Sequence, residues 1–405
     1  MKVALYYPWV YLKSGAERMV VELTGRSRHH WTIFTNRYAR HDTYPELLQR
    51  DVVELNPVSV RRSVVPAGQA ALRILTQRLP LEGYDALVVL TDGLGDLAVL
   101  RNVPVPSICL CMTPLRIAFD PAYRGRYFQS CGPWTAAVVR AAAAAFRVVD
   151  RHAWNRYDHI LSISGEVTRR IVEGRLAAAG RVETVRLGVG FDPEPAPGPL
   201  GDFFLIPGRI MWTKNIDLGI AAFRRFRETS PRGRDFRLVV AGHVDRKSVA
   251  YLDRLKAGLG ADSGVEFAPS PSDAELRALY RSCYGVLFTA FNEDWGMIPV
   301  EAMAFGKPVV ATDRGGPRET VLHGATGFLE SPEPEAFAAR MAELAEDPGK
   351  ARAMGAAGLE RSRLFTWDGF VSRMDDCVET LASERNAARA NGRVAQLAGS
   401  PGAGS

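Results

Sequence analysis

The sequence predicts an α/β fold made of two doubly wound domains. Two observations support this prediction. Apolar strand-like runs alternate with helical patterns over most of the 405 residues, and a proline-rich segment interrupts the alternation once, at residues 191–202. Continuous apolar runs are typical of parallel strands that helices cover on both faces of the sheet. A chain of this length also exceeds the size at which one hydrophobic core keeps growing.

The first half of the chain contains five expected strands, with helical stretches such as AERMVVEL and GEVTRRIVEGRL between them. The strands are expected at residues 2–7, 31–35, 85–90, 107–111 and 159–164. We therefore expect residues 1–190 to form an N-terminal Rossmann-like domain. The stretch FDPEPAPGPLGD that follows, residues 191–202, contains four prolines and two glycines and is typical of a linker.

The alternation resumes after the linker and predicts a second Rossmann-like domain over residues 203–365. Its strands are expected at residues 203–209, 236–242, 264–269, 284–290 and 308–312. An amphipathic pattern, FTWDGFVSRMDDCVETLA, predicts one more helix over residues 366–385. Small and polar residues dominate 386–405, which we expect to be a disordered tail.

The bulk composition excludes several classes of protein. The net charge of +6 is mild, so it permits an anionic ligand but does not indicate a nucleic-acid partner. The five cysteines show no metal-ligand spacing, and their odd number without a signal peptide favours a cytoplasmic protein. No apolar run is long enough to span a membrane, because Arg140 and Arg147 interrupt the longest candidate.

The stretch FNEDWGMIPVE, residues 291–301, combines a sharp turn with two glutamates. It follows an expected strand, and open α/β sheets bind ligands at the carboxyl ends of their strands. Pro299 suits the first turn of a helix. The amides of Gly296, Met297 and Ile298 would then lie at a helix N-terminus, which binds phosphate well.

The two glutamates of this stretch are candidates for holding hydroxyl groups. We place Glu301 in the first turn of the helix, where its carboxylate could accept hydrogen bonds from the two hydroxyls of a ribose. Glu293 precedes the turn and could reach a sugar. Alternatively, both carboxylates only stabilise the helix dipole, and Trp295 belongs to the core.

Two further segments support a phosphate site. In PGRIMWTKN, Arg209 directly follows an expected strand and Lys214 comes five residues later, and fixed cations of this kind are the usual partners of a diphosphate. In KSGAERMVVEL, Gly15 follows the first strand and opens a helix, so backbone amides there could approach a phosphate closely.

These segments resemble glycosyltransferase family four, the retaining group 1 transferases with the GT-B fold. EDWGMIPVE followed by AMAFGKPVVATDRGGPRETV resembles the E-x7-E region of that family. GRIMWTKNIDLGIAAF is similar to its phosphate-binding segment, SGAERMVVEL to its glycine loop, and CMTPLRIAFD to its C-H-T-P-x-R segment. The resemblance implies two Rossmann-like domains facing across a cleft, with a last helix that crosses back to the N-terminal domain.

The resemblance implies a retaining transfer of a sugar from a nucleotide diphosphate sugar to an acceptor hydroxyl, without a metal or other cofactor. Arg209 and Lys214 would bind the diphosphate, and with Glu293 they would form the catalytic group. Glu301 would hold the ribose and Glu293 the donor sugar. The rest of the donor site would consist of Gly15, Trp295, Gly296, Met297, Ile298 and Met112.

Met112 departs from the family pattern, which usually has histidine at this position. In relatives that histidine approaches the donor sugar, often at its 6-hydroxyl. Because methionine donates no hydrogen bond, we hypothesise a donor without that hydroxyl, a 6-deoxy sugar or a pentose. Alternatively, Met112 only packs there. Ser14 also replaces the usual second glycine of the N-terminal loop.

The acceptor should bind to the N-terminal domain, where Trp9, Tyr11, Arg116 and Asp120 are the candidate residues. A small molecule, a glycolipid and an oligosaccharide all remain open as acceptors. Residues 116–156 contain seven arginines and two aspartates. This segment either makes peripheral contact with the inner face of a membrane or is an ordinary helix with a solvated basic face.

Other functions remain open at this point. An epimerase-type enzyme of the same fold would handle nucleotide sugars without transferring them, and a non-catalytic protein could bind them only. A dehydrogenase is disfavoured because the chain lacks the glycine fingerprint of dinucleotide-binding domains. Monomer and homodimer are equally compatible with the sequence.

Overall fold

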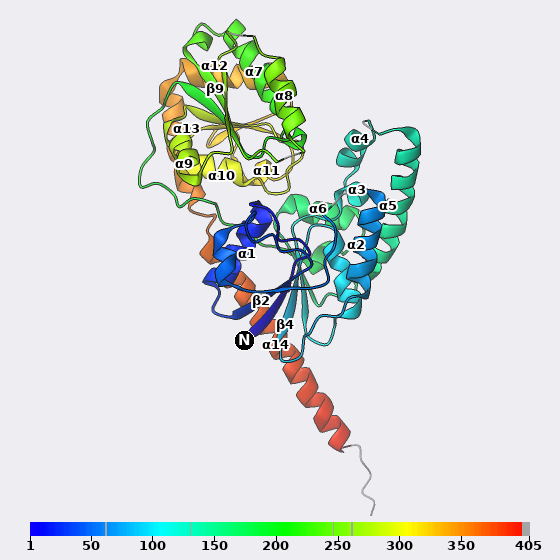
Figure 1. Cartoon of the computed structure of the whole chain (residues 1–405). Helices are drawn as coiled ribbons and strands as arrows, with labels where there is room; N and C mark the ends of the chain where they lie inside the picture. The colour runs from blue at the N-terminus through cyan, green and yellow to red at the C-terminus, as the bar shows by residue number, and fades with distance from the viewer. Residues whose placement is uncertain (61–62, 130, 246, 261, 399–405) are drawn as a thin grey trace, which may run out of the picture. The chain divides into compact units, whose positions relative to one another are not determined.

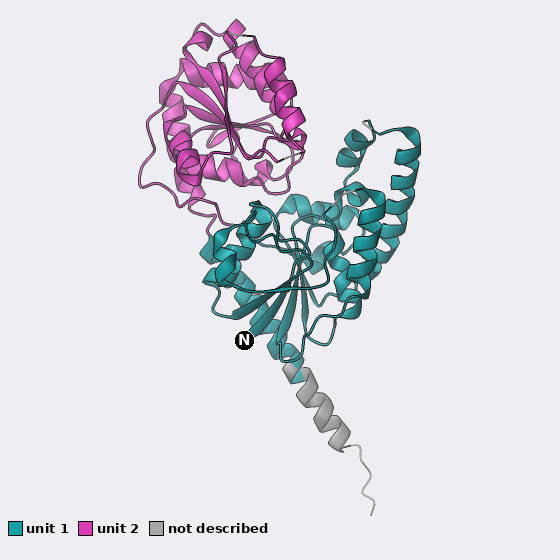
Figure 2. Cartoon of the chain, in the orientation of Figure 1, with its two compact units in different colours: residues 1–187, 367–405 teal, residues 188–366 magenta. Residues whose placement is uncertain are grey.

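Each of the two units of the chain is built on one parallel sheet (Figure 2). Unit 1 comprises residues 1–187 and 367–405, and unit 2 comprises residues 188–366. The computed structural model describes residues 1–60, 63–129, 131–245, 247–260 and 262–398. The prediction of an α/β fold with two doubly wound parallel sheets is confirmed.

Unit 1 contains a seven-stranded parallel sheet in the order β3-β2-β1-β4-β5-β6-β7. Its strands are β1 (Lys2–Tyr6), β2 (His30–Thr35), β3 (Asp51–Glu54), β4 (Ala86–Thr91), β5 (Ser107–Cys111), β6 (His159–Ser162) and β7 (Val182–Thr184). Its helices are α1 (Gly15–Arg26), α2 (Val64–Thr76), α3 (Arg116–Phe119), α4 (Pro121–Gln129), α5 (Pro133–Trp154), α6 (Gly165–Glu173) and α14 (Trp367–Ala398), with 3-10 turns η1 (Pro45–Gln49), η2 (Leu94–Arg101) and η3 (Ala179–Arg181). The central strands are buried on both faces, as their continuous apolar runs require.

Unit 2 contains a six-stranded parallel sheet in the order β10-β9-β8-β11-β12-β13, with helices around it (Figure 1). Its strands are β8 (Phe203–Pro207), β9 (Arg237–Gly242), β10 (Val265–Pro269), β11 (Gly285–Phe288), β12 (Val309–Thr312) and β13 (Gly327–Glu330). Its helices are α7 (Ile216–Thr229), α8 (Val249–Ala257), α9 (Asp273–Ser282), α10 (Met297–Ala304), α11 (Pro317–Thr320), α12 (Pro334–Glu346) and α13 (Pro348–Ser362), with 3-10 turns η4 (Trp212–Lys214) and η5 (Gly233–Asp235).

Three strands, β3, β7 and β13, have no counterpart among the expected strands. All three lie at or next to the outer edges of the sheets. They are short, and β3 and β7 are only partly buried. A short strand at a half-covered edge lacks the continuous apolar run that marks a central strand, so the sequence pattern does not show it.

The proline-rich segment packs against unit 2. The amide of Glu194 donates to the carbonyl of Ala304 at 2.8 Å, and its carboxylate accepts from Arg281 at 2.7 Å. Further on, the buried ammonium of Lys307 donates to the carbonyl of Pro199 at 2.5 Å. The segment therefore has fixed polar contacts over much of its length.

The last helix, α14, belongs to unit 1 and is longer than the sequence pattern indicates. It continues through Ala398, so helix occupies residues 386–398 of the segment that we expected to be disordered. Residues 399–405 lie outside the described part of the chain. Alanine and arginine are frequent between residues 386 and 398, and both favour helix once a preceding helix has nucleated it.

Candidate functional site

The chain reverses its direction across the sheet of unit 2 between two neighbouring central strands. β8 pairs with β11, and from β8 the chain moves to β9 on one side, whereas from β11 it moves to β12 on the other. In open α/β sheets, ligands bind outside the carboxyl ends of strands at such a switch point. Arg209 follows β8 and Glu293 follows β11, so both lie at this place.

Lys214 and Glu293 form an ion pair at the switch point. The Nζ of Lys214 lies 2.7 Å from Oε2 of Glu293, and both side chains are only partly exposed. The backbone of Lys214 is fixed as well, because its carbonyl accepts from the Thr289 hydroxyl at 2.8 Å. The sequence indicated these two residues in separate segments of the chain, and the structure brings them into contact.

Arg209 lies where two backbones cross closely. The amide of Gly208 donates to the carbonyl of Ala241 at 2.9 Å, and a Cβ at Gly242 would lie 1.7 Å from the carbonyl oxygen of Gly208. A Cβ at Gly208 itself would lie 2.7 Å from Cδ1 of Ile298. The loop that carries Arg209 therefore rests against the first turn of α10. The part of the chain that the structure describes provides no ion-pair partner for Arg209.

The N-terminus of α10 lies at this switch point. Gly296 is its N-cap, with φ +81°, and the helix begins at Met297, so the amides of Met297 and Ile298 lie in its first turn. A left-handed φ suits glycine, which has no Cβ to clash. The helix ends before Gly306, which has φ +67°. Free amides and the helix dipole make this end suitable for an anion.

The expected position of Glu301 within α10 is wrong. The helix begins two residues before Pro299, so Glu301 is its fifth residue and no acidic residue lies in the first turn. The reason is that Gly296 takes the cap position with a left-handed backbone, which starts the helix earlier than the proline alone suggests. Glu301 therefore lies one turn deeper along the helix.

Tyr280 holds the carboxylate of Glu301. Its hydroxyl donates to Oε2 of Glu301 at 2.8 Å, and its buried ring stacks on Phe305 with 5.2 Å between the ring centres. Burial and then the negative charge of Glu301 raise the pKa of Tyr280, so the hydroxyl stays protonated as a donor. On the other side, a Cβ at Gly190 would lie 2.8 Å from Oε1 of Glu301.

Sequence reasoning missed both Tyr280 and Gly190, because neither stands in a motif with Glu301. They lie 21 and 111 positions before it in the chain. A buried tyrosine normally indicates only core packing, and a glycine next to a proline-rich segment indicates a turn. Only the tertiary fold places both against the same carboxylate.

Two glycines position the backbone of Glu293. Glu293 forms an isolated parallel bridge with Gly315, and the amide of Gly316 donates to the carbonyl of Glu293 at 2.9 Å. A Cβ at Gly315 would lie 2.2 Å from that carbonyl oxygen. The segment DRGGP after β12 thus fixes the loop that carries the glutamate.

Trp295 belongs to the core. Its side chain is 3% exposed and its ring meets Phe365 edge-on, with 5.5 Å between the ring centres. The side chain therefore lies in the core, as the alternative predicts, and donor binding at Trp295 stays a prediction. The reason is that the turn at Gly296 directs the backbone outward and leaves the preceding side chain inside. Only backbone groups around Trp295 remain available to a ligand.

In unit 1 the loop after β1 is tied down by a buried carboxylate. Glu17 accepts hydrogen bonds from the amides of Tyr11 at 3.4 Å and Leu12 at 3.2 Å, and from the hydroxyl of Ser14. Burial raises the pKa of Glu17 above its usual value, although these hydrogen bonds act in the opposite direction. Helix α1 begins at Gly15, directly after this loop, so two of the loop's amides are already used.

The other candidates in unit 1 lie near the ends of β1 and β5. Trp9 is partly buried, and its indole nitrogen has no hydrogen-bond partner within the described residues. Met112 directly follows β5 and is partly buried, and its amide donates to the carbonyl of Thr91 at 2.9 Å.

Arg116 and Asp120 contact each other. The guanidinium of Arg116 lies 3.0 Å from the buried carboxylate of Asp120, and the buried Arg170 approaches the same oxygen at 3.8 Å. Burial alone would raise the pKa of Asp120, but the amide of Tyr123 and the two guanidinium groups outweigh it and lower that pKa. An acceptor would therefore meet a partly neutralised pair rather than two separate charges.

One group of residues in the described part has the composition of a metal site. Ligand atoms of His159, Glu183 and Cys377 lie within 4.8 Å of one another. However, Arg373 donates to Glu183 at 2.6 Å, and burial raises the pKa of the Cys377 thiol to about 11. Because a metal ion needs a thiolate and an unpaired carboxylate, these residues do not fit one.

The comparisons with known proteins agree with the fold. Residues 199–361 match the family described as glycosyl transferases group 1. The chain is 36% identical to human alpha-1,3/1,6-mannosyltransferase ALG2 over 187 residues, which is 44% of this chain and 45% of that protein. It is 30% identical to D-inositol 3-phosphate glycosyltransferase of Streptomyces avermitilis over 249 residues, 57% of this chain and 53% of that protein. The chain thus spans about half the length of the curated relatives it matches.

Solved structures show the same fold over nearly the whole chain. The complex of HepE of Anabaena with UDP superimposes with a TM-score of 0.68 at 18% identity, covering 94% of this chain and 100% of that one. Sucrose-phosphate synthase of Thermosynechococcus elongatus gives 0.69 at 18% identity, with 95% and 100% covered. The solved structures therefore confirm the predicted fold of two Rossmann-like domains.

Proposed function

We propose that this chain, of which residues 199–361 match the group 1 glycosyltransferases, transfers a sugar from a nucleotide diphosphate sugar to a hydroxyl group. The acceptor belongs to one of three classes, a small molecule, a glycolipid or an oligosaccharide. No metal or other cofactor takes part in the reaction that we propose, since fixed cations serve the leaving group.

The observation that carries this proposal is the arrangement at the switch point of unit 2. Lys214 and Glu293 lie 2.7 Å apart, the loop of Arg209 rests on α10, and the amides of Met297 and Ile298 lie at the helix N-terminus. Cations and free amides suit a diphosphate, and carboxylates suit the hydroxyls of sugars. HepE, which has the same fold, was solved with UDP and with UDP-glucose.

We assign the roles as follows. Arg209 and Lys214 stabilise the negative charge that develops on the leaving diphosphate, a task for preorganised charges in a site of low polarity. Glu293 accepts hydrogen bonds from the donor sugar, and Glu301, which Tyr280 holds in place, binds the ribose. The reaction retains the anomeric configuration. A phosphate oxygen of the donor takes the proton of the acceptor hydroxyl as the new glycosidic bond forms, and the bond between the anomeric carbon and the diphosphate breaks, so that the nucleoside diphosphate leaves.

Unit 1 provides the acceptor site in this proposal. Trp9 and Tyr11 lie in the loop after β1, and the Arg116–Asp120 pair lies beyond the end of β5. These positions correspond to the carboxyl ends of central strands, where ligands of doubly wound sheets bind. None of the five cysteines, all within the described residues, forms a disulfide, which suits the reducing cytoplasm.

Calorimetry with UDP, GDP and ADP, followed by mass spectrometry of reaction products with an acceptor panel, tests the proposal. We expect one nucleotide to bind, and Lys214→Ala to lower kcat by about 10²-fold, the order seen when one charge-stabilising group is removed. Arg209→Ala should weaken binding of the diphosphate. The matched control is Arg224→Ala, because Arg224 is exposed on α7 and has only a backbone partner at 3.4 Å.

Four outcomes would contradict the proposal. If the wild-type protein binds no nucleotide, or if Arg224→Ala weakens binding as much as Arg209→Ala, the site is misassigned. Conversion of the nucleotide sugar to its epimer in the absence of any acceptor would favour the epimerase alternative, and nucleotide binding without any product would favour a binding protein.

The donor sugar is a separate point of the proposal. Met112 leaves this position without a hydrogen-bond donor, so we propose a 6-deoxy sugar or a pentose. Turnover should then be several-fold higher with a 6-deoxy nucleotide sugar than with the matched 6-hydroxy sugar, and Met112→His should reduce the difference. Equal turnover of the two donors by the wild-type enzyme would show that Met112 only packs.

A further inference from the structure

The α4–α5 hairpin, residues 121–154, combines basic charge with an unusual outer face. Residues 121–149 contain four arginines and neither aspartate nor glutamate. In Figure 1, α4 and the first part of α5 extend beyond the remainder of unit 1. Helix α4 buries no residue at all. Helix α4 and the first part of α5 are therefore surface features, whereas the end of α5 packs into unit 1 through Ala153 and Trp154.

The outer face of α5 is apolar although it is exposed. Trp134 is 85% exposed, Val138 51%, Val148 70% and Val149 40%. Apart from Arg140, the exposed positions between Trp134 and Val149 carry only threonine, alanine and valine. A solvated helix face normally carries charges. The sequence alternative of an ordinary helix with a solvated basic face therefore does not describe this side of α5.

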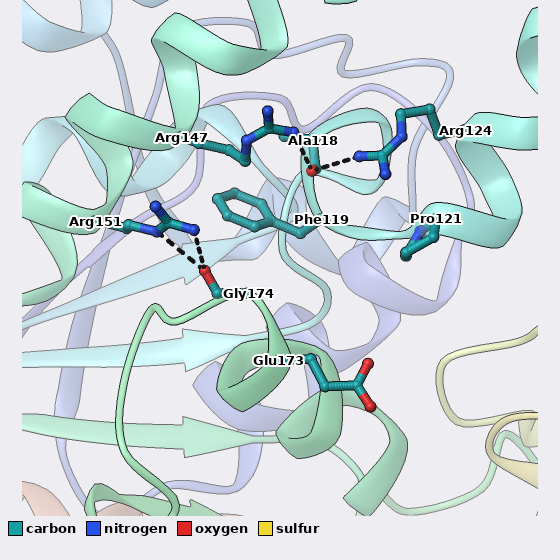
Figure 3. A pocket seen from close by; sticks show the side chains of 8 residues that line it. All are labelled: Ala118, Phe119, Pro121, Arg124, Arg147, Arg151, Glu173 and Gly174. Carbon is teal, nitrogen blue, oxygen red and sulfur yellow. Dashed lines mark hydrogen bonds between the residues drawn. The ribbon is translucent and has the colours of Figure 1, made fainter.

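Three arginines, Arg124, Arg147 and Arg151, line a hollow near Ala118 and Gly174 (Figure 3). Arg124 and Arg147 each donate to the carbonyl of Ala118 at 3.2 Å, and Arg151 donates to the carbonyl of Gly174 at 3.0 Å. The hollow has a volume of about 160 Å³. A second one, of about 250 Å³, is lined by Arg124, Arg140, Ala143 and Arg147.

These guanidinium groups lack acidic partners. Within the described residues, no carboxylate lies within ion-pair distance of Arg124, Arg140, Arg147 or Arg151. Glu173 lines the first hollow, but it pairs with Arg169 at 2.6 Å. Arginines that bond only to carbonyls keep their full charge and further donors, and the guanidinium fork matches the geometry of a phosphate.

We propose that the α4–α5 hairpin docks onto a membrane that contains anionic phospholipids. The arginines bind lipid phosphates, and Trp134 with the exposed valines enters the boundary between headgroups and acyl chains. No helix within the described ranges is long and apolar enough to cross the bilayer, so the contact is peripheral. A second copy of this chain suits the hairpin less well, because two hairpins with five arginines each would repel.

Flotation of the full-length protein with vesicles tests this proposal. Vesicles of phosphatidylcholine alone are compared with vesicles in which about one third is phosphatidylglycerol, at low and high salt. We expect binding only to the anionic vesicles and weaker binding at high salt. Arg124→Gln/Arg140→Gln should weaken binding about 25-fold, since each basic residue near such a surface contributes about fivefold. Arg147 still satisfies the Ala118 carbonyl in this variant.

Trp134→Ala tests the apolar part of the surface. We expect it to weaken binding to anionic vesicles about tenfold, because a large apolar side chain no longer leaves water. Its control is Leu48→Ala, since Leu48 is exposed in η1, outside the hairpin. The control for the arginines is Arg224→Gln on unit 2. Both controls should bind as the wild type does.

Several results would overturn the proposal. Equal binding to neutral and anionic vesicles, or unchanged binding by both hairpin variants, would refute it. Release by excess glycerol phosphate, with no loss in Trp134→Ala, would assign the arginines to a free phosphate compound instead. A dimer in sedimentation velocity that Trp134→Ala dissociates would assign the face to a second copy. Nucleotide affinity, measured in parallel, should stay unchanged, so this test is independent of the proposed transferase activity.

Discussion

Two carboxyl groups lie next to each other inside unit 1 and bear no relation to the candidate site. Asp96, in η2, accepts hydrogen bonds from Tyr157 at 3.1 Å and from Thr91 at 2.5 Å. In the described part of the chain, neither oxygen of Asp150, in α5, has a hydrogen-bond partner. Burial raises the pKa of Asp96 to about 7, and burial together with the charge of Asp96 raises that of Asp150 well above its usual value.

The raised pKa of Asp150 predicts that the protein loses stability as the pH rises. Between pH about 4 and the folded pKa, the folded state keeps a proton that the unfolded state has lost, so the free energy of unfolding falls with pH. Asp150→Asn removes this loss. We expect it to be more stable than the wild type at pH 8 and of similar stability at pH 4, after allowing for an unpaired amide. Urea denaturation at both values measures the difference.

The control for this prediction is Asp253→Asn. Asp253 is exposed on α8, and its replacement should change stability equally little at both pH values. A variant Asp150→Asn that is less stable than the wild type at pH 8 would show that Asp150 is ionised in the folded protein.

At the scale of elements, the candidate site depends on contacts between the loops that follow β11 and β12. The turn between β11 and α10 carries Glu293, and the turn after β12 holds it through Gly315 and Gly316. Because the two loops follow neighbouring parallel strands, the sheet brings them side by side.

Gly315→Ala should displace Glu293 without removing it. The new Cβ would lie 2.2 Å from the Glu293 carbonyl oxygen, and φ is +69°. We expect a loss of about 1–3 kcal/mol in stability and a fall in kcat/KM of about 10²-fold, because a displacement of about 1 Å has such an effect in an active site. Steady-state kinetics and urea denaturation measure both quantities.

Gly324→Ala is the matched control for Gly315→Ala. Gly324 also has a left-handed backbone, with φ +77°, but a Cβ there meets nothing within 4 Å. The Gly324→Ala variant should lose a similar amount of free energy of unfolding through backbone strain, and it should keep the activity of the wild type. If both variants lose activity equally, the contact with Glu293 does not position the site.

At the scale of the whole molecule, the C-terminal helix completes the N-terminal unit. α14 buries Phe370, Met374 and Val378. Arg28 pairs with Asp376 and Glu379 at 2.7 Å each, and Arg373 binds Glu183. The chain thus returns to its first unit after building the second, so unit 1 cannot complete its core until the last helix has been made.

Met374→Ala should therefore destabilise unit 1, although residue 374 directly follows unit 2 in the chain. We expect a loss of about 2–5 kcal/mol, as for other buried methionines. Hydrogen exchange measured by peptide should show faster exchange in α1 and β2, with residues 188–366 unchanged. Met354→Ala is the control, because Met354 is equally buried but lies in α13 of unit 2. Faster exchange mainly in unit 2 for Met374→Ala would contradict this reasoning.

The sequence by itself determined the two parallel sheets, the central strands and the segments that carry Arg209, Lys214 and Glu293. Apolar periodicity is a local property, and central strands carry it most strongly. It also indicated the glycine turn before α10, since a left-handed backbone requires glycine. Because strands and turns are encoded by neighbours in the chain, these features could be predicted from the letters alone.

The tertiary structure alone decided which distant groups meet. It paired Tyr280 and Gly190 with Glu301, placed Trp295 in the core, joined Asp96 to Asp150 and exposed the apolar face of α5. No motif in the sequence links the residues of these contacts or marks which side chains are buried. The physical reason is that burial and side-chain contact depend on how helices and strands pack against one another. Contacts between residues far apart in the chain therefore cannot be predicted from their spacing in the sequence.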